Sequence, residues 1–346
     1  MSELVNIIAS DAENICKKVD LSEIKNKSLL ITGASGLIGG YFLACLEQLS
    51  CINKWKFKVS ALMRSEPPHF LNEFLNYGRV NVFQGDLTDH EFCKGLPKVD
   101  YIIHAAGYGQ PGRFMENPVK TLQINTLSTF LSFEKLNPQG KFLFASTSEI
   151  YSGLTNPPYK ESQIGTTNTT HPRACYIEAK RCGEAICNAY RARGVNAKSA
   201  RLSLAYGPGT RQGDLRVINS FIQKAINGQI TLLDQGKAMR TYCYIADAIE
   251  IMWDVLLFGK EPIYNVGGHS RITIGELAMK IGAYMHVPVV FPEVSKDIVG
   301  APDDVQLDMS KVEKEFGKTD YVEFDVGLAR TIKWQKALYN TLYKKS

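Results

Sequence analysis

A short apolar run that leads directly into a glycine-rich turn constrains the fold of this chain more than any other feature. Residues 28–32 (SLLIT) have the composition of a buried strand, and Gly33, Gly36 and Gly39 follow at regular spacing before a helical pattern over 38–49. Glycines in this arrangement allow a tight turn, a close approach of the backbone to a diphosphate, and close packing of the helix on the strand, while the helix N-terminus faces the negative charge. The sequence therefore predicts a strand, a turn and a helix that hold a dinucleotide.

The same alternation of strand and helix continues along the chain. Further apolar runs predict strands at 57–63, 80–84, 100–104, 141–146 and 197–203, and helical patterns are clearest over 118–135 and 175–193. Strands that alternate with helices indicate βαβ units and a parallel sheet. We therefore expect an α/β protein with a Rossmann-type doubly wound parallel sheet and a smaller C-terminal α/β substrate domain.

The length of 346 residues exceeds that of a usual single core and favours a division into domains. We predict a helical extension over 1–27 that packs on the first domain, and a dinucleotide-binding domain formed by 28–205 together with about 240–266. Residues 206–239 and 267–346 would form the second domain. Beyond residue 206 the predicted strands lie near 230–233 and 262–266, and the predicted helices near 217–227, 245–258, 273–285 and 324–343.

The composition argues against several classes of function. The net charge of +5 comes from 40 basic and 35 acidic residues spread along the chain, so we expect no nucleic-acid partner. No apolar run approaches the roughly 18 residues that a membrane span requires, so we expect no membrane partner. The eight cysteines contain no CxxC pair and no His/Cys cluster, which favours reduced thiols in a cytoplasmic protein and no metal site.

Several positions are candidates for contacts with the dinucleotide. The second strand ends in Met63-Arg64 rather than in the acid that binds the adenosine ribose in most NAD sites. The missing acid leaves NADP possible, because Arg64 could pair with a 2′-phosphate. Arg64 could equally stack on the adenine or be solvated, so NAD is the cofactor that we expect. Asp86 follows the third strand, where its carboxylate could accept from the adenine amino group or cap the next helix. The fourth strand ends in small residues, 105–107, that leave room for a cofactor, and we interpret His104 beside them as a packed histidine rather than a base.

A tyrosine and a lysine four residues apart are the candidate catalytic pair. Tyr176 and Lys180 fall in a helical stretch and would share one face of it. A phenol with a pKa near 10 is a poor base at neutral pH, but a neighbouring ammonium and a cationic nicotinamide ring both favour the phenolate. Thr147 and Glu149 follow the fifth strand, at the edge where open α/β sheets bind ligands, and would supply a hydroxyl for the reacting alcohol and a second acid/base group.

These motifs resemble those of the extended short-chain dehydrogenase/reductase superfamily of nucleotide-sugar epimerases, dehydratases and decarboxylases. The resemblance runs from about residue 28 to 320 and includes TGxxGxxG, GDL, HAAG, STSE, YxxxK and YGPG. The segments ASTSEIY, HPRACYIEAKRCGEAICNAY, LRVINSFI and RTYCYIADAI are most similar to the UDP-glucuronate decarboxylases (UDP-xylose synthases).

The resemblance implies a tightly held NAD that is reduced and re-oxidised within one turnover on a nucleotide sugar, with a UDP-sugar as the expected substrate. Tyr176 would take the proton of the sugar C4 hydroxyl, and Lys180 would lower the pKa of Tyr176 and hold the cofactor ribose. The resulting 4-keto uronate would lose CO2, with Glu149 and Arg240 managing protonation or carboxylate contact, and Arg216 would line the substrate. The resemblance also implies a homodimer formed through the helices near 118–135 and 175–193.

The complete set of candidate site residues follows from the motifs and the resemblance together. The catalytic candidates are Thr147, Glu149, Tyr176 and Lys180, and the substrate-binding candidates are Ser148, Arg216 and Arg240. The cofactor-binding candidates are Gly33, Ser35, Gly36, Leu37, Ile38, Gly39, Arg64, Asp86, Leu87, Ala105, Ala106, Gly107, Asn125, Ser146, Tyr176 and Lys180.

Three departures from the family pattern leave the substrate and the final reaction open. Ser203-Leu204-Ala205 stands where the family usually has an asparagine, Val305 replaces a family arginine, and Met63 replaces the acid of the second strand. The first two would weaken familiar contacts to the diphosphate or the sugar. A 4,6-dehydratase, a 4-epimerase or 4-keto reductase, and a non-catalytic dinucleotide sensor are the alternatives to the decarboxylase.

Overall fold

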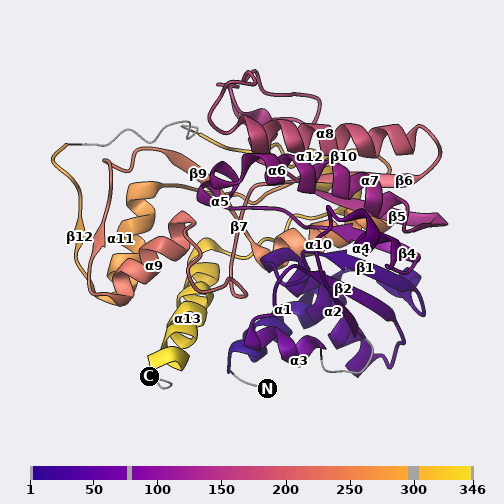
Figure 1. The fold of residues 1–346 in the computed structure, drawn as a ribbon. Coiled ribbons are helices and arrows are strands. Elements are labelled where there is room, and N and C mark those ends of the chain that lie inside the picture. Colours follow the sequence, from indigo (N-terminus) through magenta and orange to yellow (C-terminus); the bar gives the residue numbers. More distant parts are fainter. Residues whose placement is uncertain (1–2, 76–79, 295–303, 344–346) are drawn as a thin grey trace.

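A central sheet of seven parallel strands organises the larger part of the molecule (Figure 1). The computed structural model describes residues 3–75, 80–294 and 304–343, so parts of the expected second domain lie outside it. The strands run in the order β3-β2-β1-β4-β5-β6-β10. Their bounds are β1 (Ser28–Thr32), β2 (Lys58–Met63), β3 (Val80–Gln84), β4 (Val99–His104), β5 (Leu136–Thr147), β6 (Asn196–Leu202) and β10 (Ile263–Val266). Because strand order reverses at β1, as in doubly wound dinucleotide-binding sheets, the predicted Rossmann-type fold class is confirmed.

Helices cover both faces of this sheet because both faces are apolar. Along β5, Phe142 and Phe144 point into one buried cluster, whereas Leu143 and Ala145 point into the other. The helices α7 (Leu127–Phe133) and α8 (Ala174–Arg191) contact the sheet on the phenylalanine side, and α2 (Leu37–Ile52) and α10 (Ile245–Phe258) cover the opposite face. The period of two residues in the strands thus places successive side chains in alternate layers.

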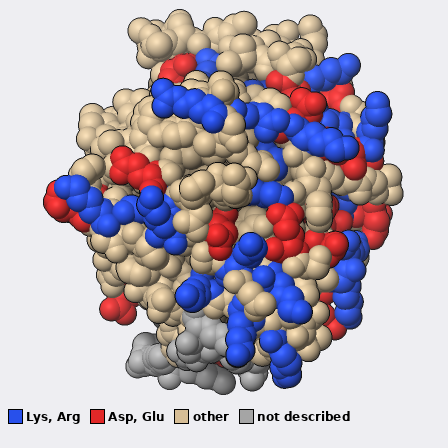
Figure 2. Space-filling view, turned by 90° about the vertical axis from the view of Figure 1, so that its right-hand side faces the viewer, with Lys and Arg blue, Asp and Glu red and all other residues tan. Residues whose placement is uncertain are grey.

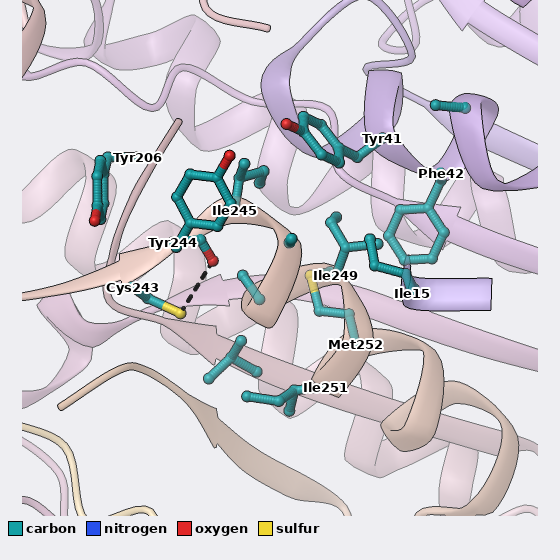
Figure 3. Close-up of a cluster of buried hydrophobic side chains, with 14 of the residues drawn as sticks. Ile15, Tyr41, Phe42, Tyr206, Cys243, Tyr244, Ile245, Ile249, Ile251 and Met252 are labelled. Atoms are coloured by element: carbon teal, nitrogen blue, oxygen red, sulfur yellow. Dashed lines mark hydrogen bonds between the residues drawn. The ribbon is translucent and has the colours of Figure 1, made fainter. Parts of the chain in front are cut away.

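The N-terminal helix α1 (Glu3–Lys18) packs against α2 and α10, as expected, and also against α13 (Phe324–Tyr343). Its residue Ile15 lies in a buried cluster with Phe42 of α2 and with Met252 of α10 (Figure 3). The carboxylate of Asp11 on the same helix accepts hydrogen bonds from Tyr41 and Tyr244 at 2.9 and 2.7 Å. The extension is therefore part of the core rather than an appendage.

A second group of elements lies beside the carboxyl ends of the large sheet. The strands β7 (Leu204–Tyr206), β9 (Met239–Tyr244) and β11 (Ser270–Thr273) form a sheet in the order β11-β9-β7, and β8 (Ile230–Thr231) pairs with β12 (Val289–Val290). The helices of this group are α9 (Val217–Ile226), α11 (Ile274–Met285) and α13. We expected the span at 240–266 to return to the first domain. Within it, β10 joins the large sheet and α10 packs on that sheet, whereas β9 belongs to the three-stranded sheet. The domain boundaries themselves stay a prediction.

Two sequence-based elements differ from the structure. The helix predicted over 118–135 is divided into α6 (Pro118–Asn125) and α7, with Thr126 between them. The strand predicted at 141–146 begins at Leu136, because Leu136 pairs with Val99 before the register shifts. The remaining short elements are η1 (Ser22–Ile24), η2 (His69–Leu71), α3 (Asn72–Leu75), α4 (His90–Lys94), α5 (Pro111–Glu116), η3 (Ser148–Tyr151) and α12 (Ser310–Phe316).

Candidate active site

The glycine turn between β1 and α2 has the geometry that a diphosphate requires. Gly33 has a φ of +64°, and a Cβ placed there would lie 2.6 Å from the carbonyl oxygen of Ala105. A Cβ at Gly39 would lie 2.6 Å from the carbonyl oxygen of Gly33, so this glycine sets the close packing of helix on strand. Gly36 is the N-cap of α2 and supplies no capping side chain, which leaves the backbone N–H groups of Leu37 and the next residues facing outward. Ser35 and Ile38 lie in the same turn and its first helical turn.

The end of β4 forms the neighbouring wall of this site. A Cβ at Gly107 would lie 3.4 Å from Oδ1 of Asn125 and 3.7 Å from Nζ of Lys180, so these three predicted residues converge. Asn125 donates from Nδ2 to the Thr121 carbonyl oxygen at 2.8 Å, while its buried Oδ1 has no hydrogen-bond partner among the described residues. An orphaned acceptor beside a buried ammonium fits a hydroxyl-bearing ligand such as the ribose of a dinucleotide.

His104, just before these residues, is packed rather than poised for catalysis. Its Nδ1 lies 3.0 Å from Thr32 Oγ1 and its Nε2 lies 3.2 Å from Ser128 Oγ. Burial, reinforced by the charge of Lys180, lowers the pKa of His104 to about 3. A neutral imidazole held by two hydroxyls agrees with our interpretation from the sequence.

The residues predicted to contact adenosine lie at the ends of β2 and β3. Asp86 accepts from the backbone N–H of Thr88 at 2.9 Å in the turn after β3 and forms an ion pair with Lys120. The alternative that Asp86 caps the next helix is wrong, because Asp89 is the N-cap of α4 and accepts from its first N–H groups. Burial acts to raise the pKa of Asp86, but the bonds from Lys120 and Thr88 hold it below the usual value. Leu87 is buried, and the exposed Arg64 donates to the hydroxyl of Tyr108. The adenine contact of Asp86 stays a prediction.

The tyrosine and lysine pair occupies one face of α8, as their spacing predicts. Tyr176 is 9% exposed and its ring stacks on Phe114 with centroids 4.5 Å apart. Lys180 is buried, its Nζ lies 5.9 Å from the centre of the Tyr176 ring, and it donates to the carbonyl oxygen of Ala145 at 2.6 Å. The ammonium therefore lies beside the tyrosine ring without bonding to the phenol, and the backbone of β5 holds it in place.

Burial sets the pKa of both members of this pair in the protein alone. Burial raises the pKa of Tyr176 to about 12, although a hydrogen bond with Thr147 and the charges of Arg173 and Arg216 lower it. Burial also lowers the pKa of Lys180 to about 7, against the pull of Glu184. Burial thus dominates the pKa of Tyr176 in the protein alone, and formation of the phenolate requires added positive charge beside the ring. The lowering of the tyrosine pKa by Lys180 stays a prediction.

The hydroxyls at the end of β5 have different surroundings. Thr147 hydrogen bonds with the Tyr176 phenol and lies where a substrate hydroxyl could be shared between the two. Ser146 instead donates to Oε1 of Glu184 at 2.6 Å, so its hydroxyl belongs to a buried network with Arg201. Ser148 begins η3 and is half-buried. Of the three hydroxyls, that of Thr147 is therefore the one that contacts the candidate catalytic tyrosine.

Glu149 lies among arginines beside the tyrosine. Its Oε1 forms an ion pair with Nη2 of Arg173 at 2.9 Å, and its buried Oε2 has no partner among the described residues. Burial raises the pKa of Glu149, against the charges of Arg173 and Arg240. The carboxyl group is therefore adapted to hold and release a proton close to the reacting centre.

The two predicted substrate arginines come from the second group of elements and reach the same place. Arg240 on β9 is close enough to Glu149 to act on its pKa, and it donates to the Met239 carbonyl oxygen at 2.7 Å. Arg216, the N-cap residue of α9, is held by Asp214 at 2.6 Å and acts on the pKa of Tyr176. Tertiary packing thus brings both to the Tyr176 face of the large sheet.

The sequence analysis missed two residues of this cluster. Arg173 is 8% exposed, pairs with Glu149, and lies over the Phe114 ring with its Cζ 5.5 Å from the centroid. Its position three residues before Tyr176, in the quoted segment HPRACY, was a signal that could have identified it. Phe114, which supports both side chains from α5, carries no such signal.

The described residues hold no group of three or more histidine, cysteine, aspartate or glutamate side chains able to bind a metal. In the same part of the chain, no helix is both long and apolar enough to cross a bilayer. Figure 2 shows basic and acidic side chains interspersed over one face of the molecule. All eight cysteines are free thiols.

Comparisons with known proteins identify a family and a fold. A family model described as the NAD dependent epimerase/dehydratase family matches residues 29–267. UDP-glucuronic acid decarboxylase 1 of Danio rerio is 29% identical over 328 residues, which cover 91% of this chain and 74% of that protein. Among solved structures, an epimerase of Methanothermobacter thermautotrophicus aligns with a TM-score of 0.79 at 20% identity over 99% of this chain and 98% of its own. The NAD-bound dTDP-glucose 4,6-dehydratase DesIV of Streptomyces venezuelae aligns with a TM-score of 0.79 at 23% identity over 91% of this chain and 98% of its own.

Proposed function

The chain belongs to the NAD-dependent epimerase/dehydratase family, and from this premise we propose that it oxidises a nucleotide uronate at C4 and then decarboxylates it. Membership makes the chain an NAD-dependent enzyme of nucleotide-sugar metabolism and removes the dinucleotide sensor from the alternatives. The observation that carries the decarboxylase over the other reactions is the position of Glu149 among Arg173 and Arg240, next to Tyr176. A protonatable carboxyl group and several cations suit a substrate that carries a carboxylate.

The first step uses the residues around the phenol. Tyr176 takes the proton of the C4 hydroxyl, which Thr147 holds by a hydrogen bond, and the buried ammonium of Lys180 opposes reprotonation by its charge. The bound nicotinamide, when oxidised, supplies the hydride acceptor and the positive charge that this phenol needs. Phe114 keeps the ring of Tyr176 fixed and excludes water from its face.

The second step uses the carboxyl group and the arginines. A ketone at C4 makes the C5 carboxylate a β-keto acid, so the C–C bond to CO2 breaks and its electron pair enters an enolate. Glu149 then delivers a proton to C5, and its raised pKa makes it a better donor near neutral pH than an ordinary glutamate. Arg240 and Arg173 would hold the carboxylate that leaves, and a bound reduced nicotinamide would supply the hydride that C4 needs to complete the turnover.

A 4,6-dehydratase is the second candidate because Glu149 is equally placed to remove a proton from C5. The test is mass spectrometry of the products after incubation with a panel of nucleotide sugars and nucleotide uronates. Loss of the mass of CO2 supports decarboxylation, loss of the mass of water supports dehydration, and an unchanged mass indicates epimerisation. A product that keeps the carboxyl carbon of UDP-glucuronate would refute the proposal for that substrate.

We further propose a cytoplasmic homodimer. The outer helices α6 and α7 expose apolar side chains that include Val119 (67%), Leu122 (40%) and Phe130 (48%), and α6 packs beside α8 (Figure 1). A second copy that repeats the same face would cover these side chains. Sedimentation should show a dimer that Phe130→Asp dissociates and that Val326→Asp, an exposed apolar position on α13, leaves intact. The free thiols support a reducing compartment.

A further inference from the structure

Three arginines from separate elements meet beside the glycine turn. Arg211, in the segment after β7, donates from Nε to the carbonyl oxygen of Ser35 at 3.1 Å. Burial, and next the charges of Arg113 on α5 and Arg64 after β2, lower the pKa of Arg211, so both of these exposed side chains lie near enough for their charge to act on it. Arg64 also lies over the Tyr108 ring, with its Cζ 5.3 Å from the centroid. We call Arg64, Arg113 and Arg211 the arginine cluster.

The described part of the protein offers this cluster no anion. Two other arginines near the site have a carboxylate: the buried Arg173 pairs with Glu149, and the half-buried Arg216 pairs with Asp214. By contrast, no ion pair to a described residue is formed by any member of the arginine cluster, and Nη2 of Arg211 is buried without a hydrogen-bond partner there. Gathering like charges and burying a donor are both unfavourable, so the arrangement is adapted to an anionic ligand.

The position of the cluster identifies which anion this is. In the sheet, β2 lies next to β1, so Arg64 directly follows the strand beside the glycine turn. An acid at this strand end binds the 2′-hydroxyl of the adenosine ribose in NAD sites, whereas an arginine accommodates a 2′-phosphate. Here Met63 is buried in the core and Arg64 is the first polar side chain after it. The diphosphate itself is served by the N-terminal N–H groups of α2.

We propose that the arginine cluster binds a phosphate on the 2′-hydroxyl of the adenosine ribose, so that this chain binds NADP(H) more tightly than NAD(H). The family is described as NAD-dependent, and the inference concerns a preference of this chain within that family. It does not depend on which sugar reaction the enzyme performs, because it concerns the affinity of the protein for the nucleotide and is tested without turnover.

The test is direct binding of nucleotides to the full chain after removal of any copurified cofactor. Titration followed by nucleotide fluorescence should give an NADPH dissociation constant about tenfold or more below that of NADH, a ratio that falls as salt is added. Calorimetry with adenosine 2′,5′-bisphosphate and with 5′-AMP should show the same order, and these probes contain no diphosphate or nicotinamide. Equal constants for the two reduced cofactors, or tighter binding of NADH, would overturn the proposal.

Variants separate the 2′-phosphate from the diphosphate as the bound group. Arg64→Ala should weaken NADPH about tenfold or more and leave NADH within about twofold. Arg211→Ala removes the bond to the Ser35 carbonyl oxygen and can distort the turn, so thermal unfolding is used to check that the variant folds. If it does not fold, Arg211→Lys, which keeps a positive charge, tests the cluster instead. Arg193→Ala, an exposed arginine after α8 at the opposite edge of the sheet, is the matched control. Equal loss of both cofactors in Arg64→Ala would assign the cluster to the diphosphate instead and refute the proposal.

Discussion

Replacement of Glu149 by glutamine separates the proposed reaction from simple epimerisation. Glutamine keeps the size of the side chain and one acceptor, but it cannot exchange a proton at neutral pH. Tyr176, Lys180 and Thr147 are unchanged, so oxidation at C4 should still occur. The expected result is an enzyme that reduces its nicotinamide on mixing with a nucleotide uronate and then stalls.

The structure indicates how far Glu149→Gln should lower the free energy of unfolding and the turnover. The carboxylate of Glu149 meets Arg173 at 2.9 Å with side chains only 20% and 10% exposed, and the substitution turns this charge-assisted bond into an ordinary one. Such bonds contribute about 1.5–3 kcal/mol and neutral ones about 1 kcal/mol, so loss of the charge should lower the free energy of unfolding by at most about 0.5–2 kcal/mol. The fall is partly offset because a neutral amide is less costly to bury than the carboxylate, whose pKa burial raises. Turnover should fall by about 10²–10⁴-fold, because that is the usual cost of losing a general acid or base.

The assay is stopped-flow absorbance of reduced nicotinamide, combined with product analysis. The matched control is Glu178→Gln, which removes the carboxylate that pairs with Arg181 at 2.8 Å on the same helix as Tyr176. The side chain of Glu178 is 32% exposed, so its ion pair is partly screened by solvent. We therefore expect Glu178→Gln to lower the free energy of unfolding by less than about 1 kcal/mol and to leave turnover unchanged. If Glu149→Gln turns over as fast as Glu178→Gln, a third acid/base group is not needed. Both the decarboxylase and the dehydratase would then be refuted in favour of an epimerase or reductase.

Three other outcomes follow from the site. Tyr176→Phe should keep the fold and the cofactor, because the ring still stacks on Phe114, but lose about 10²–10⁴-fold in turnover; near-normal steady-state activity would remove Tyr176 from the mechanism. Gly33→Ala should lower the melting temperature and release the dinucleotide, detected by chromatography of the denatured protein, because the residue has a φ of +64° and faces the Ala105 backbone at 2.6 Å; retention of cofactor at a normal melting temperature would contradict the role of this turn. Burial lowers the pKa of Lys180 to about 7 in the folded protein, so the unfolded chain binds more protons between pH 7 and the ordinary lysine value of 10.5. This residue therefore destabilises the fold most at low pH. The melting temperature of Lys180→Met relative to the parent should therefore be more favourable at pH 6 than at pH 9.5, and a difference that is independent of pH would show that burial does not lower this pKa.

Much of the first domain could be predicted from the sequence because its signals are local. The glycine turn after residues 28–32, the apolar strands and the spacing of Tyr176 and Lys180 each act within a few residues, and the structure has all of them where we expected. The strand end at Met63-Arg64 was also visible, with its departure from the usual acid. Boundaries were less accurate where pairing partners decide them, as at Leu136, which extends β5 by pairing with Val99.

The surroundings of the candidate catalytic residues were decided by tertiary structure. No local pattern indicates that Lys180 donates to the Ala145 carbonyl oxygen or that Glu149 pairs with Arg173. Nor does one indicate that Oδ1 of Asn125 is buried without a partner among the described residues. The convergence of Arg64, Arg113 and Arg211 likewise joins a strand end, a short helix and a distant loop. Local sequence determines which elements form, because backbone geometry and apolar periodicity act over a few residues. Which charges meet, and how far burial shifts their pKa values, depends on long-range packing that removes water from both partners at once.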